Sequence, residues 1–172
     1  MIVFVNGAFG VGKTSVARVL AKRLPRAFVY DPELLGIALQ RVTHVADFQD
    51  LRVWRRLTTL AIRIAHRLRA NVIVPMAFSN VDYLNEIRAP LQSIHVCLVA
   101  PLDVVQQRIR TRNHRDEEWQ SRRAAECCDA HRDAAFAIHV DATRGVEEIS
   151  GEIVRIIMSA REARTEEEAP SR

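Results

Sequence analysis

Residues 1–20 read MIVFVNGAFGVGKTSVARVL, and this stretch decides the fold. It begins with Ile2 to Val5, a short apolar run rich in β-branched residues, which is typical of a buried strand. A glycine-rich segment follows, and from Lys13 to Leu24 apolar residues recur at helical spacing until Pro25 ends the run. A strand followed at once by a helix is the repeating unit of parallel α/β sheets. The first residues therefore predict an α/β fold.

The glycine-rich segment is Gly7-Ala-Phe-Gly-Val-Gly12-Lys13-Thr14, which matches the pattern G-x-x-x-x-G-K-[ST]. Glycines allow the backbone to curl, so that several N–H groups point at phosphate oxygens, and the positive end of the next helix adds to this attraction. We expect Lys13 to reach the β- and γ-phosphates of ATP and Thr14 to offer its hydroxyl to Mg²⁺. The residues expected to bind ATP here are Gly7, Ala8, Phe9, Gly10, Val11, Gly12, Lys13, Thr14 and Ser15.

The rest of the chain alternates between apolar strands and helical segments. Further strands are expected at 27–30, 72–76, 94–100 and 137–140, and further helices at 46–69, 81–91, 104–112, 117–131 and 146–161. Continuous apolar strands indicate a parallel sheet that is covered on both faces. We therefore predict a P-loop kinase-like three-layer sandwich with a five-stranded parallel sheet. Residues 1–163 should form its single domain, and 164–172 a disordered tail.

The helix expected at 46–69 has apolar residues at helical spacing. Its predicted buried face consists of Leu51, Trp54, Leu57, Ala61, Ile64 and Leu68.

Composition narrows the class of protein. A chain of 172 residues suits one domain, and its net charge of +4 is compatible with nucleic acid, an anionic membrane surface or a phosphate-rich ligand. We favour the phosphate-rich ligand, because many arginines fall near the expected phosphate positions. Cys97, Cys127 and Cys128 show no metal or disulfide spacing, so we expect reduced thiols in a cytoplasmic protein. No signal peptide or membrane span is expected. The apolar side of the helix at 146–161 is compatible with a membrane surface, but we expect it to pack on the sheet.

Two arginines after the fourth strand are candidates for binding phosphate. Arg108 and Arg112 lie four residues apart, so they share one face of a helix. Small kinases carry a mobile arginine-bearing lid at this place, which neutralises charge on the transferring phosphoryl group. We expect such a lid around residues 108–120, with Arg112 on the phosphates and Arg108 on the adenine or the phosphates. A solvated basic helix face is the alternative.

Asp31 ends the second strand, and ligands of open α/β sheets bind beyond the carboxyl ends of the strands. A carboxylate there can accept the proton of an attacking hydroxyl or help to hold Mg²⁺, and Glu33 could share this role. The alternative is that Asp31 only caps a helix that begins after Pro32. The third strand, NVIVPM, contains no Asp, which disfavours motor, switch and helicase functions and adds weight to Asp31.

A set of short motifs occurs in one order over residues 1–90: NGAFGVGKT, YDPELLG, DFQ, WR, IVPM and YLNEI. Together they resemble the tunicamycin-resistance protein family, within the P-loop kinase-like superfamily. The resemblance implies a cytosolic ATP-binding protein that protects the cell from tunicamycin, a nucleoside antibiotic with sugars and a fatty acyl chain. It also implies that Asp31 occupies the position of a catalytic carboxylate and Arg112 that of a lid arginine.

These observations predict an ATP-dependent small-molecule phosphotransferase with a tunicamycin-like substrate and the catalytic residues Asp31, Lys13 and Arg112. Two other functions stay open: sequestration of the antibiotic with ATP bound, and a nucleoside or nucleotide kinase. The residues expected to contact the substrate are Asp31, Glu33, Gln49, Trp54, Arg55, Met76 and Tyr83. For Trp54 a place in the core is the alternative, because an aromatic residue on an apolar helix face usually packs there.

Overall fold

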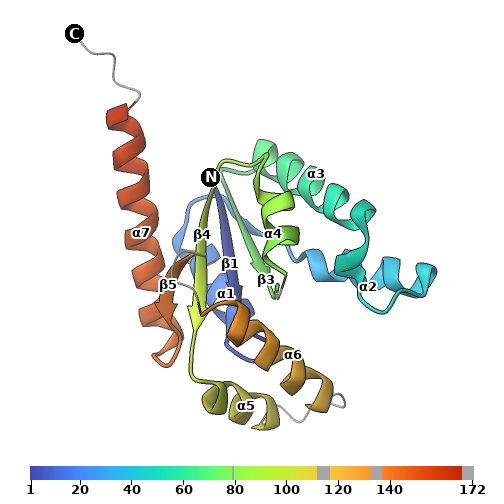
Figure 1. The fold of residues 1–172 in the computed structure, drawn as a ribbon. Coiled ribbons are helices and arrows are strands. Elements are labelled where there is room, and N and C mark those ends of the chain that lie inside the picture. The colour runs from blue at the N-terminus through green and yellow to red at the C-terminus, as the bar shows by residue number, and fades with distance from the viewer. Residues whose placement is uncertain (79, 112–116, 133–136, 168–172) are drawn as a thin grey trace.

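The computed structural model describes residues 1–78, 80–111, 117–132 and 137–167. Five strands form one sheet in the order β2-β3-β1-β4-β5, and every pairing is parallel (Figure 1). Their bounds are β1 (Ile2–Gly7), β2 (Ala27–Val29), β3 (Asn71–Met76), β4 (Ser93–Val99) and β5 (Ile138–Asp141). The predicted P-loop kinase-like fold with a five-stranded parallel sheet is confirmed.

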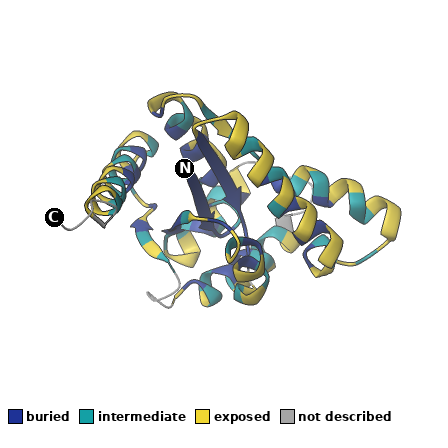
Figure 2. Cartoon of the chain, turned by 90° about the horizontal axis from the view of Figure 1, so that it is seen from above, coloured by how far each residue is buried: buried dark blue, intermediate teal, exposed yellow. Residues whose placement is uncertain are grey.

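Helices cover both faces of this sheet. They are α1 (Lys13–Arg23), α2 (Pro32–Thr43), α3 (Arg52–Leu68), α4 (Val81–Arg88), α5 (Leu102–Thr111), α6 (Glu117–Ala130) and α7 (Val146–Glu167), with a 3-10 turn η1 (Phe48–Asp50). Neighbouring residues of β1 serve opposite faces: Val3 packs in a cluster with α1 and α7, and Phe4 in one with α3 and α4. Both faces of the strand are therefore apolar, and Figure 2 shows the sheet buried beneath the exposed outer sides of the helices.

The segment between β2 and β3 differs from the prediction. The helix α2 was expected only as an alternative role for Asp31, and the single helix predicted at 46–69 is divided into η1 and α3. Local capping explains both differences, because Asp31 caps α2 and Asp47 caps η1, each through a backbone N–H two residues on. His44, with a left-handed φ of 55°, ends α2.

The helix α3 buries a different face from the predicted one. Thr58 and Ile62 are fully buried, whereas Leu57, Ile64 and Leu68 are 38%, 49% and 67% exposed. The buried face also carries Arg55, whose polar groups have partners inside the protein. The predicted face was therefore correct at Trp54, which is buried, but wrong at Leu57, Ile64 and Leu68. The buried face is rotated from the predicted one because two of its side chains, Arg55 and Thr58, are polar.

The two isoleucines of α3 test this orientation directly. Ile62→Ala should lower the free energy of unfolding by about 2–5 kcal/mol, because it leaves a cavity in the core. Ile64→Ala, the matched control on the exposed side, should change it by about 0.5 kcal/mol or less. Urea unfolding of both variants measures the difference. A larger loss in Ile64→Ala than in Ile62→Ala would contradict the described orientation of α3.

Candidate functional site

The glycine-rich turn joins the carboxyl end of β1 to the start of α1. Gly10 and Gly12 have φ angles of 80° and 111°, which favour glycine. A Cβ on Gly10 would lie 2.7 Å from Cγ1 of Ile109, so α5 packs directly against the turn. The first helical turn of α1 contains no acidic residue. No carboxylate of the helix itself therefore neutralises its positive end, which faces the glycine-rich segment. This geometry suits an anion at the helix end.

A cavity of about 520 Å³ opens beside the turn. Its lining consists of Phe9, Gly10, Gly12, Lys13, Thr14, Ser15, Arg18, Asp31, Glu33 and Pro75. The Lys13 ammonium donates a hydrogen bond of 2.8 Å to the carbonyl of Ala8 and lies 5.3 Å from the ring centre of Phe9. Two cations, a helix end and a curled backbone fit the phosphates of ATP, and the Thr14 hydroxyl with nearby carboxylates fits Mg²⁺.

The predicted carboxylates meet the phosphate-binding turn in this cavity. Asp31 also caps α2, since its Oδ1 accepts a hydrogen bond of 3.0 Å from the N–H of Glu33. Asp31 can therefore cap α2 and still face the cavity, so its roles as a helix cap and as a site carboxylate are compatible in geometry. Burial raises the pKa of Glu33; nearby Lys13 opposes this shift, whereas Asp31 adds to it. Glu33 is therefore biased towards its neutral form, in which a carboxyl group can donate a hydrogen bond.

Helices α5 and α6 contact the turn from the other side. Arg108 donates a hydrogen bond of 3.1 Å to the carbonyl of Val11, which places its guanidinium next to the turn. The rings of Phe9 and Trp119 meet edge to face at 5.3 Å, a contact that the sequence did not indicate. Arg112 and residues 113–116 of the expected lid lie outside the described residues. The remainder of the predicted lid falls on the end of α5 and the start of α6.

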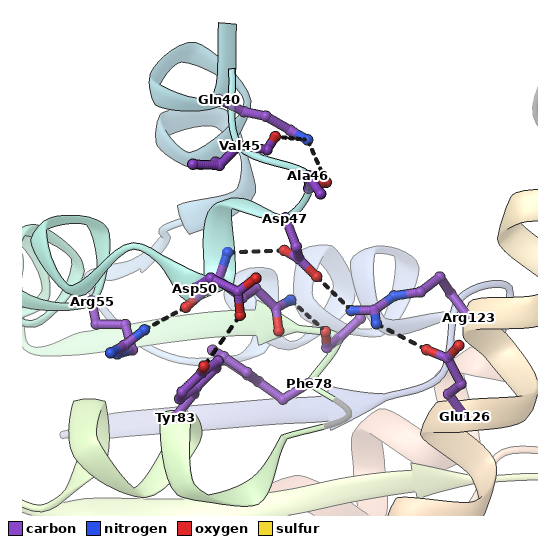
Figure 3. A network of polar contacts seen from close by, with 12 residues as sticks. Gln40, Val45, Ala46, Asp47, Asp50, Arg55, Phe78, Tyr83, Arg123 and Glu126 are labelled. Carbon is purple, nitrogen blue, oxygen red and sulfur yellow. Dashed lines mark hydrogen bonds and ion pairs between the residues drawn. The ribbon is translucent and has the colours of Figure 1, made fainter. Parts of the chain in front are cut away.

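Three residues predicted to contact the substrate belong to one polar network on η1, α3 and α4 (Figure 3). The side-chain amide of Gln49 donates to the carbonyl of Ala77 at 2.9 Å, and Arg55 donates to the carbonyl of Gln49 at 2.6 Å. Arg55 also pairs with Glu86 at 2.6 Å and lies 4.2 Å from the ring centre of Tyr83. Gln49 and Arg55 are buried, so the network ties the end of β3 to α3 and α4.

Two other predicted substrate contacts lie in the core behind the site. Trp54 is 1% exposed, and its indole N–H donates to the carbonyl of Pro32 at 3.0 Å. Its ring packs against Phe48 and Phe78 at centroid distances of 4.9 and 6.0 Å. Met76 is 2% exposed and also belongs to this core. Neither residue lines the cavity, and for Trp54 the structure agrees with the alternative of a core position.

Sequence reasoning missed several residues of the site. Arg18 follows Thr14 by one helical turn, and this spacing was the available signal. Arg123 of α6 pairs with Asp47 at 3.0 Å and with Glu126 at 2.9 Å (Figure 3). The Asp47 pair connects α6 with the segment before η1 across 76 positions of sequence. No local pattern indicates such a contact.

Comparisons with known proteins agree with this geometry. A family model described as an AAA domain matches residues 2–135. The tunicamycin resistance protein of Deinococcus radiodurans is 32% identical, with 91% of this chain and 94% of that chain covered and a TM-score of 0.74. This chain belongs to the tunicamycin-resistance protein family. No curated protein sequence matches it.

Two kinases share the fold at lower identity. A gluconokinase from Sinorhizobium meliloti 1021 is 19% identical, with 96% of each chain covered and a TM-score of 0.71. A shikimate kinase from Acinetobacter baumannii in complex with shikimate is 20% identical, with 92% of this chain and 93% of that chain covered and a TM-score of 0.60. Within the described residues, every helix is too short or too polar to cross a membrane.

The close packing at Gly10 gives a first test of the site. Gly10→Ala should weaken ATP binding by about tenfold or more, because the new Cβ must displace α5 and adopt an unfavourable φ. Gly151→Ala in α7 is the control, since its Cβ would meet only the flexible end of Arg23. Calorimetric titration with ATP measures both affinities, and unfolding curves show whether each variant is folded. An unchanged affinity in the first variant would contradict the described turn.

The raised pKa of Glu33 gives a second test. The pKa of Glu33 in the folded protein is higher than its ordinary value of 4.5. As the pH rises, the unfolded chain therefore loses this proton at a lower pH than the folded protein does. The contribution of Glu33 to stability is therefore greatest below pH 4.5 and declines as the pH rises through its folded pKa. Melting temperatures of the wild type and Glu33→Gln, measured from pH 4 to pH 7, should diverge over this window. A constant difference would contradict the shift.

Proposed function

We propose that the protein is an ATP-dependent small-molecule phosphotransferase that acts on tunicamycin or a similar nucleoside antibiotic. The observation that carries the proposal is the shared cavity, in which Asp31 and Glu33 lie with Lys13 and Thr14. A carboxylate beside a phosphate-binding turn suits transfer to a hydroxyl, because it can take the proton of that hydroxyl. The similarity to the tunicamycin resistance protein of Deinococcus radiodurans supports a tunicamycin-like substrate.

The chain's own residues would have distinct roles. The backbone of the turn, Lys13 and Arg18 would hold the phosphates, and Thr14 would contribute a ligand to Mg²⁺. MgATP would supply the terminal phosphoryl group. The acceptor hydroxyl would form the new P–O bond and give its proton to Asp31, while ADP leaves with the electrons of the broken bond. Lys13 would stabilise the charge that develops, and Arg112 is expected to join it.

The acceptor would lie between the carboxylates and the network on η1 and α4. Glu33, which lines the same cavity, would contact the acceptor beside Asp31. Gln49, Arg55 and Tyr83 would shape and orient the wall of the site, since the first two are buried and already bonded to each other. Positioning of this kind supplies a large part of the rate in phosphoryl transfer.

Mass spectrometry of tunicamycin after incubation with the protein and MgATP tests the proposal. The antibiotic should gain one phosphoryl group with the wild type and none with Lys13→Ala. Asp31→Asn should lower turnover by about 10²–10⁴-fold, the usual contribution of a general base, and leave the affinity for ATP nearly unchanged. Turnover equal to that of the wild type would remove Asp31 from the mechanism.

The same experiment separates the other functions. Tightly bound but unmodified antibiotic, with protection in proportion to the amount of protein, would point to sequestration instead of transfer. Phosphorylation of plain nucleosides in preference to the antibiotic would point to a nucleoside kinase. If the protein neither binds nor modifies these compounds, the proposed substrate class is wrong.

A further inference from the structure

A second cavity, of about 430 Å³, lies at the opposite end of the sheet from the phosphate-binding turn. Arg63, His66 and Arg67 of α3 line one side, and Arg161 and Arg164 of α7 line another. In Figure 1 the amino end of β1, which also lines the cavity, lies between α3 and α7. Two helices that are distant in sequence thus bring four guanidinium groups to one hollow.

Two arginines of this cavity donate hydrogen bonds to neutral oxygens. Its lining, taken over the described residues, includes no Asp or Glu. Elsewhere arginines pair with carboxylates, as Arg144 does with Glu148. Here Arg63 donates to the carbonyl of Pro90 at 3.2 Å, and Arg161 to the side-chain oxygen of Asn71 at 2.8 Å. Both of these acceptors are neutral, so the positive charge in the cavity is not balanced by them.

The ends of the two helices offset only part of this charge. The four arginines lie towards the carboxyl ends of α3 and α7, which end at Leu68 and Glu167. Each carboxyl end carries about half a negative charge, so the two together offset about one of the four positive charges. Favourable helix-end contacts therefore offset about one of the four charges and leave about three.

The amino group of Met1, which also lines the cavity, has a pKa that is affected by two of these arginines. It donates a hydrogen bond to the carbonyl of Ala70, and its pKa is lowered by burial, with Arg161 and Arg164 adding to the shift. Burial also lowers the pKa of His66, which lies 3.2 Å from this amino group. Burial is the largest cause of both shifts, and the arginines contribute only to that of the Met1 amino group.

We propose that this second cavity binds the phosphoryl or diphosphate group of a ligand other than the nucleotide in the turn. Guanidinium groups bind phosphate oxygens in pairs with fixed geometry, and a diphosphate carries enough negative charge to match the excess. The volume lies within the range of small-ligand pockets. The proposal is independent of the phosphotransferase activity, because none of these residues lines the first cavity.

The phosphoryl group can belong to a soluble compound or to a lipid headgroup. The helix α3 exposes Leu60, Ile64 and Leu68 at helical spacing from one another, and Ile64 lies three residues before Arg67, so apolar surface accompanies the cationic cavity. Exposed apolar residues next to cations on one helix are typical of surfaces that contact anionic lipid. The test therefore includes both sources.

Nuclear magnetic resonance with inorganic pyrophosphate as the probe separates the two phosphate sites of the full chain. The amide signals of Leu91 and Gln92 report on the second cavity, and those of Gly10 and Gly12 on the turn. Saturable shifts are expected at both sites. Arg67→Gln/Arg164→Gln should weaken binding at Leu91 and Gln92 by about tenfold or more and leave the turn within about twofold of the wild type.

Two further variants serve as controls. Arg56→Gln/Arg155→Gln removes the same charge from exposed positions of the same two helices and should leave both sites within about twofold of the wild type. Arg67→Lys/Arg164→Lys keeps the charge but removes the planar fork, and should give an intermediate loss. This variant also provides a folded comparison if the glutamine variant does not fold. Absence of saturable shifts at Leu91 and Gln92 in the wild type would overturn the proposal.

Vesicle sedimentation then identifies the source of the phosphoryl group. Vesicles of phosphatidylcholine with and without phosphatidylglycerol are the probes. Binding that requires phosphatidylglycerol and is lost in Arg67→Gln/Arg164→Gln would assign the cavity to a lipid headgroup. Pyrophosphate binding without vesicle binding would assign it to a soluble phosphorylated compound. If pyrophosphate does not bind at this cavity, the proposal fails whatever the vesicles show.

Discussion

The packing of α5 against Gly10 is the contact on which the candidate site depends. A side chain at this position would collide with Ile109, so only glycine lets the turn and the helix approach so closely. The same approach brings Arg108 to the carbonyl of Val11. One backbone constraint therefore fixes the curl that presents N–H groups to phosphate and also the position of a cation beside it.

The chemistry of the first cavity follows from the sheet order. Because β2 lies two strands from β1 in a parallel sheet, its carboxyl end brings Asp31 to the edge where the turn begins. Burial raises the pKa of Glu33, and the neighbouring Asp31 adds to this shift, so the two carboxyl groups interact within the cavity. A carboxylate beside the phosphate-binding turn can take the proton of a hydroxyl substrate. This is the physical basis of the proposed phosphotransferase.

Positively charged side chains have different neighbours at the two ends of the sheet. At the carboxyl ends of the strands, Lys13 and Arg18 share their cavity with two acidic residues, Asp31 and Glu33. At the amino ends, Arg67 and Arg164 share a hollow whose described lining has no acid. The net charge of the chain is only +4, so composition did not reveal this separation. The second anion-binding site is therefore inferred from where the charges lie in the structure and not from the net charge of the chain.

The sequence alone determined the strand–turn–helix unit, the parallel sheet and the family, because these depend on residues close together in the chain. Asp31 was also found from its place at the end of a strand. Only the tertiary structure decided which face α3 buries, since Arg55 and Thr58 are buried there and apolar Ile64 is not. It likewise decided the pairing of Arg123 with Asp47 and the cluster around Arg164. These contacts join distant segments, and a polar side chain is stable inside a protein only when its partner is supplied from elsewhere in the fold.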